Sequence, residues 1–166
     1  MPARPVVLIV EDDPHTAAVL AQTVEDMGLS ARAYTGPAAS LEAFDAVSTG
    51  VLPPISASVI DLCLDETGLH DGHWLRRAML YRGMCEPSML LTGAYIDGRV
   101  LSRVSPLFTE VARKPVGLAV LHAFLAPLVE AAEQPRACAG CVIVRADCDR
   151  DSQDDRIAAP ELASLH

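Results

Sequence analysis

The sequence predicts an α/β fold with a doubly wound, five-stranded parallel sheet. Apolar runs rich in β-branched residues alternate five times with segments of helical periodicity, and parallel strands require such helical crossovers, which are nearly always right-handed. Hydrophobic residues make up 51% of the 166 residues and charged residues 21%, which is sufficient for a globular core. A chain of this length provides one domain and a short appendage.

The first strand–helix unit has the clearest signals. Pro5–Val10 is an uninterrupted apolar run, as expected for a strand that is buried on both faces. Asp13 is the expected N-cap of the next helix, with Pro14 in its first turn and Gly28 at its end. The residues of this helix that we expect to face the sheet are Ala17, Ala18, Leu20, Ala21 and Val24.

Four further strands alternate with four further helices. The other expected strands are Leu29–Thr35, Ser56–Leu62, Ser88–Thr92 and Phe108–Ala112. The other expected helices are Pro37–Val47, His73–Arg82, Ile96–Val104 and Val116–Glu133. Pro127 is expected to bend the last helix, because proline cannot donate a backbone hydrogen bond.

Residues 4–131 form the predicted domain, and residues 132–166 form an acidic, cysteine-containing tail that we expect to be flexible. Five aspartates lie between Asp147 and Asp155, without a sustained hydrophobic period. Cys138 and Cys141 have the two-residue gap of a zinc or redox pair, and Cys148 is a third thiol, but no fourth ligand is evident. We interpret them as exposed tail cysteines, with a metal or redox pair as the alternative.

The charge of the chain disfavours several classes of partner. Acidic residues outnumber basic ones by 22 to 13, which gives a net charge of −9. We therefore expect neither nucleic acid nor an anionic membrane surface as a partner. No apolar run reaches the roughly 18 residues of a membrane span, and five irregularly spaced cysteines do not form a disulfide framework. These features favour a cytoplasmic protein with reduced thiols.

Chemically active side chains follow four of the five expected strands. Glu11 and Asp12 follow the first strand, the third runs into Asp61, Thr92 ends the fourth and Lys114 follows the fifth. Ligands of open α/β sheets bind beyond the carboxyl ends of the strands. Carboxylates from neighbouring strand ends repel each other, so the sequence predicts Mg²⁺ between them. Beside Mg²⁺, Asp61 can attack a phosphoryl group while Thr92 and Lys114 hold its oxygens.

Each of these residues also has an ordinary structural explanation. Glu11 and Asp12 suit the start of a helix, where negative charge complements the helix dipole. Thr92 is compatible with an ordinary strand-end hydroxyl and Lys114 with a surface lysine. Asp61 is harder to explain in this way, because a carboxylate after an apolar strand requires a cation or water. The joint placement of the four strand ends favours a site.

Four motifs resemble those of the receiver domain of bacterial two-component response regulators. They are VVLIVEDD at the first strand, VIDL at the third, LLTG at the fourth and RKP after the fifth. Each motif alone is a weak signal, but four in order at strand ends are a strong one. The resemblance covers residues 4–131 and implies the flavodoxin-like strand order 2-1-3-4-5.

The resemblance implies a role for each carboxylate. Asp61 is expected to be the phosphoacceptor and a metal ligand. Asp12 is expected to bind Mg²⁺ directly, Glu11 through water, and Cys63 through its backbone carbonyl.

The resemblance also assigns the residues around the phosphoryl group. Thr92 and Lys114 are expected to contact phosphoryl oxygens, and Pro115 is expected to follow Lys114 through a cis peptide bond. Val111 occupies the position of the family's aromatic switch, so a switch based on an aromatic rotamer is not expected.

The segment after Asp61 departs from the family pattern. Position 65 is Asp rather than Pro, and the pair Asp71–Gly72 comes about three residues later than usual, which predicts an enlarged acidic loop. Cys63 and Ala94 stand where water-orienting polar groups are common, and neither is a good partner for an attacking water. We therefore hypothesise slow hydrolysis of the phosphoryl group.

The function implied by the resemblance is that of a stand-alone receiver. It would take a phosphoryl group from a histidine kinase or histidine phosphotransferase onto Asp61 and catalyse only its own phosphorylation and dephosphorylation. The face formed by the fourth helix, fifth strand and fifth helix would then change, and a homodimer through it is possible. The alternative is a degenerate receiver that acts as a phosphorylation-independent interaction module. A phosphatase would require a second acid at the position of Cys63.

Overall fold

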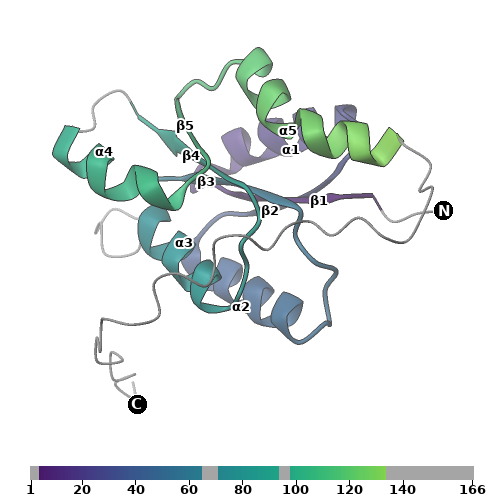
Figure 1. Cartoon of the computed structure of the whole chain (residues 1–166), viewed down its shortest axis with the longest axis horizontal. Helices are drawn as coiled ribbons and strands as arrows, with labels where there is room; N and C mark the ends of the chain where they lie inside the picture. Colours follow the sequence, from purple (N-terminus) through teal and green to yellow (C-terminus); the bar gives the residue numbers. More distant parts are fainter. Residues whose placement is uncertain (1–3, 65–70, 94–97, 134–166) are drawn as a thin grey trace. The chain divides into compact units, whose positions relative to one another are not determined.

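A computed structural model describes residues 4–64, 71–93 and 98–133, which form one parallel sheet covered by helices on both faces (Figure 1). The strands are β1 (Val6–Val10), β2 (Ser30–Tyr34), β3 (Ala57–Asp61), β4 (Ser88–Thr92) and β5 (Glu110–Arg113). The helices are α1 (Pro14–Asp26), α2 (Pro37–Ser48), α3 (Gly72–Tyr81), α4 (Gly98–Val104) and α5 (Leu118–Glu133). The strand order β2-β1-β3-β4-β5, with every pair parallel, confirms the predicted doubly wound flavodoxin-like fold.

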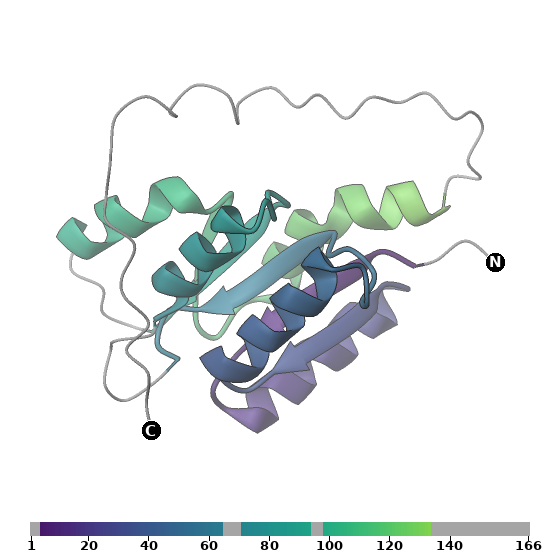
Figure 2. The ribbon, with the colours of Figure 1, turned by 90° about the horizontal axis from the view of Figure 1, so that it is seen from below.

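Two hydrophobic clusters, one on each face of the sheet, follow from the alternation of strand residues. In β1, Val7 and Ile9 belong to one cluster and Leu8 and Val10 to the other, because successive strand side chains point to opposite faces. The first cluster receives side chains from α1 and α5, namely Leu20, Val24, Leu121 and Leu125. The second receives side chains from α2, α3 and α4, namely Phe44, Leu75, Met79 and Val104. Figure 2 shows α2 and α3 in front of the strands in the view from below.

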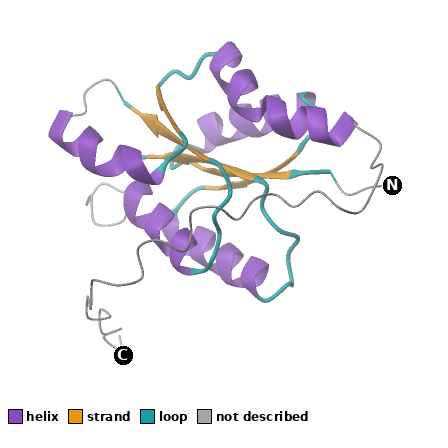
Figure 3. Cartoon of the chain, in the orientation of Figure 1, coloured by secondary structure: helices purple, strands orange, loops and turns teal. Residues whose placement is uncertain are grey.

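The boundaries of several elements differ from the prediction for local reasons. Helix α3 begins at Gly72, one residue before the predicted start, because the Asp71 side chain accepts a hydrogen bond from the backbone of Trp74 and caps the helix. Strand β5, the strand next to the loop that leads into α5, is drawn in orange in Figure 3. It begins at Glu110 rather than Phe108, because residues 105–107 form a short 3-10 helix and Phe108 is buried in the second cluster.

Helix α1 has the predicted cap, since both carboxylate oxygens of Asp13 accept backbone hydrogen bonds from the first turn. Its inner face is narrower than predicted: Ala18 is exposed, whereas Ala17, Leu20 and Val24 are buried. Helix α5 includes Pro127 and continues to Glu133. Within the described residues, no helix combines the length and the apolar character needed to cross a bilayer.

Some predictions fall on residues outside the described ranges. They concern Asp65, Ala94, the first two residues of the Ile96–Val104 helix and the tail with its cysteines.

Candidate functional site

The strand register brings the predicted site residues to one edge of the sheet. Val10 pairs with Ile60, so Glu11 and Asp61 both lie at the carboxyl ends of adjacent strands. The backbone N–H of Leu62 donates to Leu91 at 2.8 Å, and that of Lys114 donates to Thr92 at 2.7 Å. These two hydrogen bonds extend the pairing with β4 one residue past the ends of β3 and β5.

The ammonium group of Lys114 joins the acids of β1 and β3. Its Nζ lies 2.9 Å from Oδ2 of Asp61 and donates to Oε1 of Glu11 at 2.8 Å. The other oxygen of Glu11, Oε2, lies at 2.6 Å in an ion pair with the same ammonium, but it accepts no hydrogen bond from the described residues. Glu11 is 1% exposed and Asp61 4%. Among the described residues, one cation therefore balances two buried carboxylates.

The electrostatics of the three groups follow from their burial. Burial raises the pKa of Asp61, although Lys114 and the backbone of Cys63 act in the opposite direction. Burial also raises the pKa of Glu11, against the hydrogen bond from Lys114 and with a further increase from the charge of Asp61. For Lys114, burial lowers the pKa, but its contacts with Glu11 and Asp61 outweigh this effect and the net pKa is raised. The acids are therefore costly to ionise without additional positive charge.

A divalent cation fits this cluster. Carboxylate oxygens of Glu11, Asp12 and Asp61 all lie within 4.8 Å of one another, with Asp12 exposed and the other two buried. The ligand set contains only oxygen, which Mg²⁺ prefers, and the exposed side leaves space for the waters that Mg²⁺ retains.

The remaining predicted residues surround this cluster. Thr92 is 3% exposed at the end of β4, and its hydroxyl donates to the carbonyl of Gly93 at 3.2 Å. Cys63 has an exposed side chain two residues after Asp61. The Lys114–Pro115 peptide bond is cis, as the resemblance implies. Val111 is half-buried on β5 and packs against the cluster that contains α3 and α4.

Sequence reasoning did not identify Gly72, which contacts the backbone of Asp61. A Cβ atom on Gly72 would overlap the carbonyl oxygen of Asp61. The pair Asp71–Gly72 was recognised only by its unusual position in the sequence. An aspartate followed by glycine before a helical period is an N-cap signal, and that signal indicates where the helix begins.

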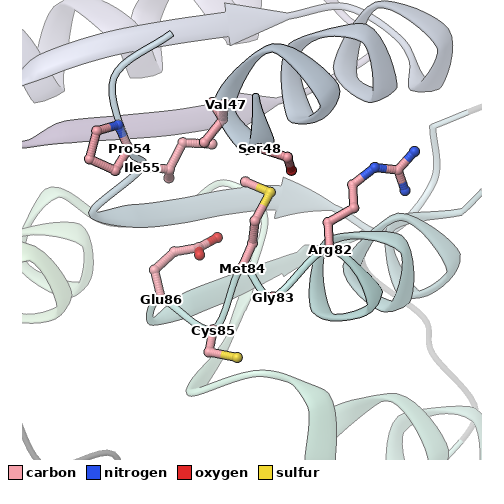
Figure 4. A pocket seen from close by; sticks show the side chains of 9 residues that line it. All are labelled: Val47, Ser48, Pro54, Ile55, Arg82, Gly83, Met84, Cys85 and Glu86. Atoms are coloured by element: carbon pink, nitrogen blue, oxygen red, sulfur yellow. The ribbon is translucent and has the colours of Figure 1, made fainter. Parts of the chain in front are cut away.

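A hollow of about 400 Å³ lies at the opposite edge of the sheet (Figure 4). It is lined by the residues that precede β3, such as Pro54 and Ile55, and those that precede β4, such as Met84 and Glu86. It therefore lies at the amino ends of the strands, and none of the predicted site residues lines it. In this fold the chemistry is expected at the carboxyl ends, so we assign the site to the acidic cluster.

Comparison with known proteins identifies the class of fold. No protein-family model and no curated protein matches the sequence. Among solved structures, a response regulator receiver protein from Pseudomonas putida superposes with a TM-score of 0.64 at 22% identity, over 76% of this chain and 99% of that chain. A response regulator receiver domain protein from Clostridium thermocellum gives a TM-score of 0.63 at 16% identity, over 76% and 95%. A sensor protein from Polaromonas sp. JS666 gives 0.61 at 25% identity, over 78% and 98%.

These superpositions show that the chain has the fold of a response regulator receiver domain. They confirm the resemblance that the four sequence motifs indicated, and they do so at identities of 16% to 25%. The described domain corresponds to nearly the whole of each of the solved receivers.

Proposed function

We propose that this chain is a phosphoacceptor receiver of a two-component phosphorelay, in which Asp61 takes a phosphoryl group from a phosphohistidine. The observation that carries the proposal is the contact of one ammonium, that of Lys114, with Asp61 at 2.9 Å and Glu11 at 2.8 Å at the carboxyl ends of the strands. The arrangement combines a nucleophilic carboxylate, a fixed positive charge and acidic metal ligands, which are the groups that phosphoryl transfer requires.

In this proposal, Glu11, Asp12, Asp61 and the backbone carbonyl of Cys63 hold Mg²⁺. When bound, the ion would neutralise the carboxylates and the oxygens of the transferred group. The fit rests on the oxygen-only cluster of Glu11, Asp12 and Asp61, whose ligand atoms lie within 4.8 Å of one another.

The protein side chains supply the remaining chemistry. A carboxylate oxygen of Asp61 forms a bond to phosphorus while the bond from phosphorus to the donor imidazole breaks, and the imidazole nitrogen keeps the electron pair. Lys114 and the Thr92 hydroxyl donate hydrogen bonds to the phosphoryl oxygens, so Lys114 exchanges part of its contact with Asp61 for the new negative charge. Gly93, which follows Thr92, is exposed, and its lack of a side chain keeps this side open to the donor.

The proposed partners are a histidine kinase or a histidine phosphotransferase, together with a downstream protein or a second copy of this chain. Apolar side chains are exposed on the two helices next to β5, namely Val100, Leu101, Leu118 and Val120. This supports the face formed by α4, β5 and α5 as the surface that changes on phosphorylation. We also propose a cytoplasmic location, in keeping with the free thiol of Cys63.

Intact-mass spectrometry with acetyl phosphate tests the proposal. The full chain is expected to gain about 80 Da in Mg²⁺, and neither the parent in EDTA nor Asp61→Asn in Mg²⁺ is expected to gain it. Asp45→Asn is the matched control, because Asp45 is an exposed aspartate paired with Arg82 on a different part of the surface. A parent chain without the adduct, or an adduct that persists in Asp61→Asn, contradicts the proposal. The first outcome would favour a phosphorylation-independent interaction module.

A further inference from the structure

The first residue of α3 packs directly against the backbone of the proposed phosphoacceptor. The N–H of Gly72 donates to the carbonyl of Leu62 at 2.8 Å. A Cβ on Gly72 would overlap the carbonyl oxygen of Asp61 and would lie 3.0 Å from its carbonyl carbon and from Cγ2 of Ile60. No side chain fits at this position without displacement of the peptide that joins Asp61 to Leu62.

Packing and hydrogen bonds hold both the start of α3 and the Asp61–Leu62 peptide in place. On the helix side, the Asp71 carboxylate caps α3 at Trp74, and the side chains of Leu75 and Met79 on the inner face of α3 are fully buried. On the strand side, Leu62 is held to β4 by its hydrogen bond to Leu91 at 2.8 Å. A side chain larger than hydrogen at position 72 therefore has no easy route of relief, because both neighbours are packed backbone.

This close approach distinguishes Gly72 from the glycines at other helix starts. Gly36, which precedes α2, and Gly98, which begins α4, have open space where a Cβ would be. The backbone of Gly36 is extended, with φ of 166°, so it also tolerates a side chain. The requirement for glycine at position 72 therefore comes from the contact with Asp61 and not from the turn into a helix.

We propose that Gly72 is a positioning residue for Asp61, an inference that rests on the proposed function. By allowing α3 to touch β3, it fixes the Asp61–Leu62 peptide and with it the carboxylate that lies 2.9 Å from Lys114. Hydrogen bonds at this distance weaken steeply with displacement, and a shift of about 1 Å at reacting groups can reduce a rate by about 100-fold.

The same contact separates Asp61 from the enlarged segment that follows it. The hydrogen bond from Gly72 to Leu62 brings the two ends of residues 62–72 together. The position of Asp61 is then set by β3, β4 and α3, whatever the length of the segment between Cys63 and Asp71. An Asp71–Gly72 pair that comes later in the sequence than usual is therefore compatible with a fixed position of Asp61.

The experiment compares the full parent chain with Gly72→Ala and the matched control Gly36→Ala. Phosphorylation by acetyl phosphate is followed by intact mass at saturating Mg²⁺, at a temperature where circular dichroism shows each variant folded. Mg²⁺ binding without a phosphodonor is followed by the fluorescence of Trp74, which lies in α3. We expect Gly72→Ala to lower the phosphorylation rate at least about tenfold and to raise the Mg²⁺ midpoint about threefold or more, with Gly36→Ala within about twofold of the parent in both.

Each outcome decides the inference. A folded Gly72→Ala variant with the parental rate and Mg²⁺ midpoint overturns it, even if its urea midpoint is lower, because the role of Gly72 would then be purely structural. If Gly72→Ala does not fold, Asp71→Ala loosens the same contact by removing the cap of α3 and is expected to slow phosphorylation about threefold or more. A parental rate in Asp71→Ala then overturns the inference. A parent chain that takes up no phosphate overturns the proposed function and this inference together, whereas a reactive parent with a reactive Gly72→Ala overturns this inference alone.

Discussion

Lys114 and Glu11 lie 103 positions apart in the sequence, yet the ammonium of the first contacts both carboxylate oxygens of the second, at 2.8 Å and 2.6 Å. The same ammonium lies 2.9 Å from Asp61. One ammonium thus lies between the carboxylate that follows β1 and the carboxylate at the end of β3. It has two effects that mutation can separate, since it neutralises the acids before phosphorylation and donates to the phosphoryl oxygens during it.

Replacement of Lys114 by Met is expected to change metal binding and phosphorylation in opposite directions. The site becomes more negative without the ammonium, so the Mg²⁺ midpoint from Trp74 fluorescence is expected to fall about threefold or more. The phosphorylation rate is expected to fall at least about tenfold, because one donor to the transferred group is lost. Arg113→Met, a change at the exposed residue next to Lys114, is the control. If Lys114→Met weakened Mg²⁺ binding and slowed phosphorylation together, the two effects assigned to Lys114 would not be separable.

The pH dependence of stability follows from the raised pKa of Asp61. Burial is the main cause, and the direction is above the ordinary value of 3.8. A carboxyl with a raised pKa in the folded state contributes stability that is fully present below its unfolded pKa and is lost as the pH rises through the folded pKa. Asp61→Asn does not titrate, so its advantage in unfolding free energy over the parent is expected to grow as the pH rises from about 4 toward neutrality.

Urea unfolding of both proteins in EDTA, from pH 4 to pH 8, measures this difference. Mg²⁺ at pH 8 is expected to stabilise the parent more than Asp61→Asn, because the ion binds the folded parent through Asp61. A stability difference that is constant with pH would show that Asp61 is not costly to ionise in the folded protein.

The buried Arg76 is expected to be the most sensitive basic residue for stability. Its guanidinium is 5% exposed and donates to the carbonyls of Leu107 at 3.1 Å, Met84 at 3.3 Å and Glu86 at 2.9 Å. It also lies 3.5 Å from the buried carboxylate of Glu86. Arg76→Met leaves these acceptors without a donor and the carboxylate without its cation, so we expect a loss of about 3–5 kcal/mol in the free energy of unfolding.

Two variants serve as comparisons for Arg76→Met in urea unfolding. Arg77→Met changes the adjacent exposed arginine and is expected to alter stability by no more than about 0.5 kcal/mol. Arg76→Met combined with Glu86→Gln is expected to be more stable than Arg76→Met alone, because the unpaired buried charge is removed. Equal effects of Arg76→Met and Arg77→Met would contradict the role of the buried pair.

The sequence predicted the acidic cluster because its residues stand where apolar runs end. A polar side chain directly after a buried strand must lie at the carboxyl edge of a parallel sheet, so the positions of Asp61, Thr92 and Lys114 follow from the fold class alone. Which of these side chains touch each other depends on register and rotamer, and neither is encoded locally. The contact of Lys114 with both Glu11 and Asp61 was therefore not predicted, since the resemblance placed Lys114 only beside the phosphoryl oxygens.

Other features escaped prediction because they depend on distant segments. Arg76 lies on the inner face of α3, but a buried arginine is possible only where carbonyls from residues 8, 10 and 31 positions away converge on it. Ala18 is expected to face the sheet, yet it is exposed. Exposure of the small alanine side chain costs little free energy, so the sequence pattern does not determine which side of the helix it faces. Gly72 is required by a peptide group on another element.

The last prediction concerns the lifetime of the phosphoryl group on Asp61. Partial desolvation at the edge of the cluster and the neighbouring Asp61 charge raise the pKa of Cys63, so its side chain stays a neutral thiol at pH 7. A thiol is a weak donor and acceptor that does not orient a water well. We expect the adduct to persist for minutes or longer after the donor is removed, and Cys63→Asn to shorten its lifetime about threefold or more because an amide can hold the attacking water. Cys85→Asn changes an exposed cysteine at the opposite edge of the sheet and is expected to leave the lifetime unchanged. The lifetime in all three proteins is measured from the decay of the adduct of about 80 Da by intact mass. A parent adduct that disappears within seconds would show that another group positions the water.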